Sequence, residues 1–312
     1  MKKTTAACVA ALLLTSGAAL AAPVEFDGDI KAHYRWQTYN YQPDQEGGKF
    51  TVRLNAKTAL DEHVTAYARF AAQTLTGAKI GADFNTDRYG SDVATIDQYG
   101  FIYDNAGWSY KIGRQDLAIT PTAALVSSGS YIGKDVDFLN GVVATGTSGV
   151  TDLQLVAGNL DHSRESNSDA LYSVHGSYSP AENWTVGGTL ARFVEKNASD
   201  RNFWGVDVAY ASGKANFIID YLNSNSSSDD TARVIGVDYA FDDKNTLSVY
   251  NHKTESLADV LTDWDSGEKG FYYIYNHNFD STTSFNLLYK DNEVLNSSDK
   301  YTSLRTTVTY KF

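Results

Sequence analysis

Apolar and polar residues alternate along much of the chain, and the pattern is clearest in residues 24–36. The even positions of this stretch are apolar or glycine, whereas the odd positions are charged or histidine. Successive side chains of an extended strand point to opposite faces, so the stretch predicts one strand with an apolar face and an ionic face. Strands of soluble proteins usually have ~5 to 6 residues, whereas a tilted strand needs ~9 to 11 to cross a bilayer. The length therefore favours a membrane-spanning strand.

The same alternation recurs down to the C-terminus and predicts an all-β protein with about 16 strands. The segments that show it are residues 24–36, 50–57, 64–71, 95–104, 108–115, 138–146, 151–158, 170–178, 184–194, 202–211, 215–222, 232–241, 246–252, 270–279, 284–290 and 301–312. Short turns such as LDEH and FDDKN separate pairs of segments, and longer polar loops fill the other gaps. Short turns at one rim and long loops at the other are typical of a transmembrane antiparallel β-barrel. A soluble sandwich built from hairpins is the alternative.

One segment departs from the alternation. In residues 184–194, Arg192 falls on the same face as Trp184, Val186 and Leu190. An arginine in the middle of a bilayer costs ~2 to 4 kcal/mol, but much less near an interface. Arg192 is therefore expected either at the rim of the barrel or beyond a β-bulge that changes the phase.

The first 21 residues have the three parts of a secretory signal peptide. They begin with Lys2 and Lys3, continue with the apolar run AACVAALLL and end in small residues up to Ala21. Cleavage there leaves residues 22–312 as a single barrel domain. The only cysteine, Cys8, lies within the signal, so no cysteine of the mature chain can form a disulfide or hold a metal. No run of 18 apolar residues follows the signal, and a closed barrel is therefore the expected way to span a membrane.

Composition and motifs narrow the possible functions. Removing Lys2 and Lys3 leaves 24 basic and 38 acidic residues, a formal net charge of −14, which argues against a nucleic-acid partner. The 21 tyrosines and 4 prolines suit long strands with aromatic girdles. No cofactor or metal is expected, and neither a Gly-x-Ser-x-Gly nor a His-Glu-x-x-His motif is present. We expect no enzymatic activity, although His175 beside Ser173 and Ser177 leaves a Ser-His pair open.

Two stretches resemble the Gram-negative outer-membrane porins, and in particular the general diffusion porins. Residues 97–117, DQYGFIYDNAGWSYKIGRQDL, are similar to the hairpin before the porin constriction loop, and residues 301–312, YTSLRTTVTYKF, look like the C-terminal assembly strand. The resemblance implies that residues 116–137 fold into the bore and that the protein is a homotrimer in the outer membrane of a Gram-negative-type bacterium. It also implies that the barrel assembly machinery reads the last strand through Leu304, Val308, Tyr310 and Phe312. This loop lacks the acidic Pro-Glu-Phe-Gly-Gly-Asp type sequence, so fine selectivity does not carry over.

The alternation also places basic side chains on the inner face of one wall of a water-filled bore. The candidates on three consecutive strands are Lys31, Arg35, Arg53, Lys57 and Arg69, and Arg114 joins them because it ends the fifth strand beside the start of the loop. The resemblance implies that an arginine cluster faces an acidic constriction loop, where Asp116, Asp135 and Asp137 are the candidates. A transverse field between such walls would orient dipolar solutes. The alternative is that each basic residue hydrates the wall or pairs with Asp27, Asp29 or Asp97; Asp207, Asp220 and Asp238 are expected on the opposite wall.

These observations predict an outer-membrane porin that lets small hydrophilic solutes and ions diffuse passively across the lipid. One alternative is a substrate-specific channel, for example for sugars, which would line its bore with aromatic rings such as that of Tyr67. Less favoured alternatives are a barrel enzyme and a structural anchor. The net acidity and the basic wall oppose each other, so the sequence leaves ion selectivity open.

Overall fold

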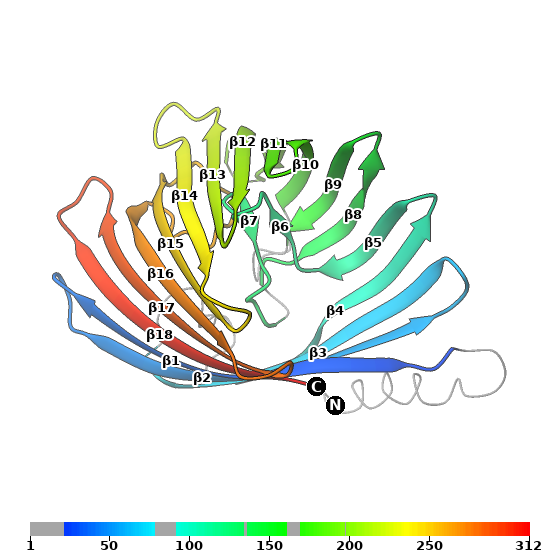
Figure 1. Ribbon diagram of the computed structural model, residues 1–312, viewed down its shortest axis with the longest axis horizontal. Helices are drawn as coiled ribbons and strands as arrows, with labels where there is room; N and C mark the ends of the chain where they lie inside the picture. The colour runs from blue at the N-terminus through cyan, green and yellow to red at the C-terminus, as the bar shows by residue number, and fades with distance from the viewer. Residues whose placement is uncertain (1–21, 79–91, 134–135, 161–168, 197) are drawn as a thin grey trace.

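The computed structural model describes residues 22–78, 92–133, 136–160, 169–196 and 198–312. The expected signal peptide and Asp135 lie outside the described residues. Sixteen strands close into an antiparallel barrel, and a short ribbon formed by β6 and β7 lies inside the curve of the barrel strands (Figure 1). The prediction of an all-β barrel with about 16 strands and an inward-folded loop is confirmed.

The barrel strands follow one another in sequence round the ring, except that β8 pairs with β5, and β18 closes on β1. Their bounds are β1 Glu25–Tyr39, β2 Gln45–Ala59, β3 Val64–Gly77, β4 Asp92–Asn105, β5 Trp108–Gln115, β8 Leu139–Ser148, β9 Thr151–Leu160, β10 Asp169–Ala181, β11 Trp184–Val194, β12 Arg201–Ser212, β13 Ala215–Ser224, β14 Thr231–Ala240, β15 Asn245–Thr254, β16 Glu268–Asn278, β17 Thr283–Val294 and β18 Lys300–Lys311. The ribbon pairs β6, Ala118–Ile119, with β7, Val126–Ser127. Within the described ranges, no helix is long and apolar enough to cross a membrane.

The two faces of the wall have opposite chemistry. On β1, Phe26, Tyr34 and Trp36 are exposed on the outside, whereas Arg35 and Gln37 are buried on the inside. Such an arrangement, apolar outward and polar inward, is the reverse of a strand that packs on the core of a soluble sandwich. It follows directly from the alternation in the sequence.

The first and last strands close the barrel through backbone hydrogen bonds at the chain end. The N–H groups of Gly28 and Phe312 each donate to the carbonyl of the other residue, at 3.0 and 3.1 Å. A Cβ atom at position 28 would clash with the backbone carbonyl of Arg53 on β2 and would lie 2.7 Å from the Phe312 ring, so glycine permits the close packing at this seam. The outward face of β18 carries Leu304, Val308, Tyr310 and Phe312, which are 36–51% exposed. The sequence placed these four side chains on one face, and the structure does the same.

Three of the tight turns are stabilised in the same way, by an aspartate side chain that accepts backbone hydrogen bonds. Asp61, Asp242 and Asp280 each accept hydrogen bonds from the backbone N–H groups two and three residues further on, at 2.7 to 2.8 Å. An aspartate that bonds its own turn in this way stabilises the chain reversal. These bonds, led by those from the His63 N–H, the Lys244 N–H and the Thr282 hydroxyl, lower the pKa of the three carboxyls. Several of the acidic residues thus lie in the turns at the short-turn rim.

The structure places Arg192 at the rim of the barrel. It lies two residues before the end of β11, pairs in regular register with Tyr172 and Asn202, and its guanidinium is 2.7 Å from Asp200. The register shift between β10 and β11 lies elsewhere, between Tyr178 and Ala181. No change of phase is needed to explain an outward-facing arginine at the end of a strand.

Candidate pore and its constriction

The loop between β5 and β8, residues 116–138, crosses the interior of the barrel. The Thr122 hydroxyl donates a 2.7 Å hydrogen bond to Asp220 on β13. The Leu125 carbonyl accepts hydrogen bonds from Val260 N and Leu261 N, at 3.0 and 3.1 Å. Because β13 lies far round the ring from β5, the loop narrows the bore instead of covering its mouth.

A second loop folds inward and meets the first. It consists of residues 255–267, between β15 and β16. The Trp264 indole donates to the Thr122 carbonyl at 2.8 Å, and the Ser127 N–H donates to the Leu261 carbonyl at 2.5 Å. The alternation of apolar and polar residues did not predict that this loop folds inward. Its apolar residues, Ala258, Val260, Leu261 and Trp264, are the signal that could have revealed it, because a solvated loop has little use for them.

The two loops fill one side of the bore with a hydrophobic core. The buried apolar residues of the loops are Leu117, Ile119, Ala124, Leu125, Val126, Ala258 and Trp264. They pack against inward-facing residues of the strands from β8 to β17, among them Leu139, Leu160, Leu171, Phe193, Phe203, Leu222, Val234, Tyr272 and Leu288. The inner face is therefore apolar where the loops cover it. Nearer the short-turn rim, polar residues of β8, β9 and β10 such as Thr145, Gln154 and His175 line a cavity of about 710 Å³.

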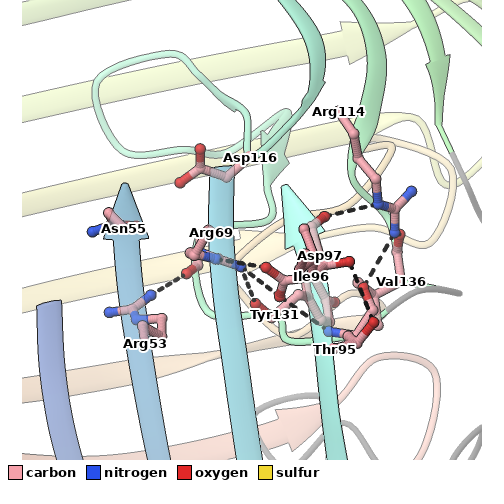
Figure 2. Close-up of polar contacts among 12 residues, drawn as sticks. Arg53, Asn55, Arg69, Thr95, Ile96, Asp97, Arg114, Asp116, Tyr131 and Val136 are labelled. Carbon is pink, nitrogen blue, oxygen red and sulfur yellow. Dashed lines mark hydrogen bonds and ion pairs between the residues drawn. The ribbon is translucent and has the colours of Figure 1, made fainter. Parts of the chain in front are cut away.

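On the other side, two arginines fasten the first loop to the wall (Figure 2). The Arg69 guanidinium donates to both oxygens of the fully buried Asp97 carboxylate, at 2.8 and 2.9 Å. The Gly133 N–H of the loop donates to the same carboxylate at 3.2 Å, and Arg114 Nε donates to the Asp97 carbonyl at 2.9 Å. A buried charge needs such a set of partners, because their removal leaves it unsolvated.

The same arginines also contact the loop directly. Arg69 donates to the Tyr131 carbonyl at 3.1 Å, and Arg114 donates to the Gly133 carbonyl at 3.2 Å. Both guanidinium groups also lie 5.1 to 5.2 Å from the centre of the Phe138 ring, within the range of a cation–π contact. The planar guanidinium of an arginine has several N–H donors, so it can donate hydrogen bonds to a carboxylate and to a carbonyl at the same time. Arg69 and Arg114 therefore position the loop.

The acidic candidates lie in different surroundings. Asp116 is partly exposed and lies 3.4 Å from Lys111, whereas Asp137 is buried. On the far wall, Asp207 and Asp220 are also buried, and Asp220 accepts the hydrogen bond from Thr122. Of the three carboxylates expected on the opposite wall, the loop contacts Asp220, whereas Asp238 is half-buried and accepts a hydrogen bond from the Tyr250 hydroxyl.

Water-accessible space remains along β1, β2 and β18. We call one cavity of about 350 Å³ the basic hollow, because Lys31, Lys49, Arg53 and Arg305 line it. Ser130 and Ile132 of the loop form part of its surface. Arg53 also lines an adjoining hollow of about 370 Å³, together with Lys57, Arg69, Lys111 and Asp116. The two hollows share a residue and form the polar part of the bore.

The predicted basic residues take three roles, which overlap at Arg53 and Arg69. Arg69 and Arg114 hold the loop, and Arg35 is buried in the wall with its Nε donating to Ser303 at 2.8 Å. Lys31, Arg53 and Lys57 line the hollows. Arg53 also pairs with Asp29 at 2.8 Å and donates to the Gly129 carbonyl at 3.1 Å.

The sequence analysis missed three basic residues of the hollows: Lys49, Lys111 and Arg305. Lys49 is the last residue of the polar stretch NYQPDQEGGK, just before the predicted strand 50–57, but β2 begins at Gln45. Arg305 has the parity opposite to Leu304 and Val308, which was enough to place it inward. For Lys49 and Arg305, the alternation of inward and outward positions was therefore sufficient to predict an inward side chain.

The possible Ser-His pair has a different partner in the structure. His175 Nδ1 lies 2.9 Å from the Thr189 hydroxyl and 3.7 Å from Asp207. A histidine that relays a proton from a hydroxyl towards a carboxylate uses its two ring nitrogens on opposite sides. Here one nitrogen makes both contacts, so this geometry does not form a catalytic relay.

Comparisons with known proteins give a fold and no close sequence relative. No protein-family model matches the chain, and no curated protein matches it. Salmonella typhi OmpF in complex with daunomycin is 12% identical, with a TM-score of 0.62, over 93% of this chain and 97% of that chain. A triple mutant of Rhodopseudomonas blastica porin is 12% identical, with a TM-score of 0.60, over 93% and 100%. Vibrio cholerae OmpT lacking loop L8 is 11% identical, with a TM-score of 0.60, over 93% and 99%.

This chain has the porin fold. The likeness covers 93% of this chain. At such low identity the likeness extends to the fold and not to individual residues. The residues that could act in this protein are therefore those of its own bore.

Proposed function

We propose that this protein is an outer-membrane porin, a water-filled channel for the passive diffusion of small hydrophilic solutes and ions. The observation that carries the proposal is the pairing of an apolar outer face with polar hollows inside one closed barrel. A barrel of eight strands is filled by its own side chains, whereas one of sixteen leaves an aqueous lumen. No chemical step is needed for such a protein to act.

The outer face supports a location in lipid. Exposed apolar residues occur on strands all round the ring, such as Phe101 on β4, Leu190 on β11 and Ile235 on β14. Soluble proteins rarely expose a continuous apolar surface of this kind. Aromatic pairs such as Trp184 with Tyr210 and Trp204 with Tyr221 suit the two membrane interfaces.

The inner face supports passive conduction. Conduction requires a wet lumen, a narrow point that sets the size limit, and wall charges that bias ion flow. The basic hollow supplies the charged wall, and the loop that Arg69 and Arg114 position supplies the narrow point. The proposed role of Lys31, Arg53 and Lys57 is to attract and orient solutes, and that of Arg69 and Arg114 is to fix the size of the opening.

We further propose a homotrimer whose last strand is recognised by the barrel assembly machinery. Both proposals rest on the resemblance of residues 97–117 and 301–312 to porin segments. The exposed row of Leu304, Val308, Tyr310 and Phe312 is open to such recognition. Light scattering of the refolded protein in detergent tests the trimer, and loss of membrane insertion on deletion of Phe312 tests the recognition.

A substrate-specific channel is the alternative that the described residues favour less. The Tyr67 hydroxyl donates to the Arg114 carbonyl at 3.2 Å, and Lys111 lies 5.1 Å from its ring centre. Both the hydroxyl and the ring therefore have partners in the wall, and Tyr67 is poorly placed to stack on a passing sugar.

The first test is conductance across a planar bilayer. Residues 22–312, refolded and inserted, should give stepwise ohmic currents, and liposomes that contain the protein should swell in small sugars but not in large oligosaccharides. Protein denatured before insertion is the control. Folded and inserted protein that gives neither current nor swelling would contradict the proposal and favour a closed structural barrel.

A further inference from the structure

We propose that the basic hollow is a binding site for small oxyanions and that it makes the channel select anions. The inference rests on the proposed function, since it names the class of solute that the same bore favours. The residues that carry it are Lys31, Lys49, Arg53 and Arg305, together with the hydroxyls between them. Inorganic phosphate is the simplest oxyanion with which to test it.

The register of three adjacent strands brings these side chains together. Lys49, Thr51 and Arg53 are successive inward residues of β2, and they pair with His33, Lys31 and Asp29 of β1. On the other side of β1, His33 pairs with Thr307 and Arg35 pairs with Arg305 of β18. Paired residues lie on the same face of a sheet. One continuous patch of wall therefore alternates cations with hydroxyl groups.

The charge of this patch is strongly positive. Four cationic side chains line the hollow, and none of the lining residues within the described ranges is acidic. Asp29, which lines the adjoining hollow, lies 2.8 Å from Arg53 and 4.0 Å from Lys31 and offsets part of the charge. An excess of one sign on a low-dielectric wall concentrates ions of the opposite sign.

Hydrogen-bond donors make the site better suited to an oxyanion than to a simple halide. Thr51, Thr307, Thr309 and Ser284 place hydroxyl groups in the lining, and Ser130 adds one from the loop. Phosphate, sulfate and carboxylates can accept several directed hydrogen bonds at once, and bonds to a charged acceptor are the stronger ones. Lysine and arginine are the usual partners of such groups.

The overall acidity of the chain does not oppose this inference, because the acids lie elsewhere. Asp207 and Asp220 are buried in the far wall, where Asp220 accepts a hydrogen bond from the loop, and Asp61, Asp242 and Asp280 cap turns. Exposed charges more than ~8 to 10 Å away are largely screened at physiological ionic strength. An ion in the hollow therefore responds mainly to the charges of its own wall.

The experiment is the reversal potential of the refolded mature protein in a potassium chloride gradient, followed by addition of inorganic phosphate. We expect a reversal potential of the sign set by chloride, and a chloride current that falls as phosphate is added. Replacing Lys49→Gln and Arg305→Gln together should lower the anion-to-cation permeability ratio by roughly tenfold, as two unit charges beside the ion would in water. It should also weaken the phosphate block.

Two controls locate the effect. Arg192→Gln removes a charge of the same sign from the outer rim, where Arg192 pairs with Asp200, and should leave selectivity unchanged. The charge-conserving variant Lys49→Arg with Arg305→Lys should keep anion preference. Equal effects of Arg192→Gln and the double variant would overturn the inference.

Different results would contradict the oxyanion site and the porin function. Steps with cation preference, or with anion preference but no effect of phosphate, would overturn the oxyanion site and leave the porin function standing. Folded and inserted protein without any steps would overturn both.

Discussion

The two sides of the bore differ although they are built from the same alternating strands. Along β1, β2 and β18 the inward residues are cationic or hydroxyl-bearing and border water-accessible space. From β8 round to β14 many inward residues near the long loops are apolar and are covered by residues 117–126 and 258–264. One side is therefore a channel wall, and the other is half of a hydrophobic core.

This difference shows that a porin-type loop can be held by two kinds of force. On the apolar side, burial of side chains such as Leu125 and Trp264 stabilises the loop without directional contacts. On the polar side, Arg69 and Arg114 hold it through directed bonds to a buried carboxylate and to carbonyl oxygens. The following variants separate the two contributions.

The largest effect is expected from Arg69→Ala on the polar side. This change leaves the Asp97 carboxylate buried without its ion-pair partner, and breaking a buried pair costs ~3 to 5 kcal/mol. Arg192→Ala is the matched control, because its pair with Asp200 is exposed and such pairs contribute ~0 to 1 kcal/mol. Urea unfolding of both variants in detergent, followed by tryptophan fluorescence, measures the difference. Equal destabilisation would mean that the Arg69 pair is not the anchor.

The apolar side is tested by Leu125→Ala. Leu125 is fully buried between the loops, and the cavity left behind should cost ~2 to 5 kcal/mol. The loss falls on loop docking, so we expect larger and noisier single-channel steps. The control is Leu190→Ala, which makes the same change at an outward position that is 67% exposed. Unchanged conductance in Leu125→Ala would show that the polar anchor alone positions the loop.

An intermediate effect is expected from the pH dependence of the stability of the second loop, residues 255–267. Burial raises the pKa of Asp259 to about 6, although the Ser266 hydroxyl and the Arg201 charge oppose it. The folded pKa lies above the ordinary value of 3.8, so loop stability is greatest below pH ~4 and declines as the pH rises through about 6, by roughly 2 to 3 kcal/mol at most. Open-channel noise should increase over this range.

Asp265 in the same loop should not contribute in that window. Burial opposes its ionisation, but the Lys290 charge and hydrogen bonds from Lys290, Tyr272 and Tyr301 outweigh it and lower the pKa to about 2. Its stabilisation is thus complete above the ordinary value of 3.8 and is lost only as the pH falls through about 2. The variant Asp259→Asn should abolish the noise change between pH 4 and 6. A persistent change in that variant would assign it to another group.

The smallest effect on stability is expected from an aromatic pair on the outer face, which is apolar on both sides of the barrel. Trp184 and Tyr210 pair across β11 and β12 with ring centres 4.5 Å apart. A double-mutant cycle with alanine at each position should give a coupling of ~0.5 to 1.5 kcal/mol. Additive losses in unfolding free energy would mean that each ring interacts with lipid and not with the other ring.

The alternation predicted the strands well, but it misjudged some of their ends. It placed the start of the second strand at residue 50, whereas β2 begins at Gln45, so Lys49 was missed as a bore residue. Arg192 was the one parity conflict noted, and a rim position explains it without a bulge. Boundaries fail because glycine and polar residues near a rim fit a loop and a strand end equally well.

The site was predicted less completely, because a contact with the loop is not encoded in any one strand. Parity brought Arg53 and Arg69 to the inner wall, and Arg114 was placed there by its position beside the loop, but neither signal could distinguish a residue that lines water from one that holds the loop. Asp220 was expected on an open wall, and instead it accepts a hydrogen bond from Thr122, which is 98 positions earlier in the chain.

The sequence by itself determined the barrel, its two faces and the inward direction of the basic residues, because alternation is a local property of an extended chain. Only the tertiary structure decided which inward residues meet water and which form a core. Which inward residues are covered depends on the positions of the two inward-folded loops. Those positions are fixed by contacts between segments that are distant in sequence, such as Leu125 with Leu261 and Gly133 with Asp97.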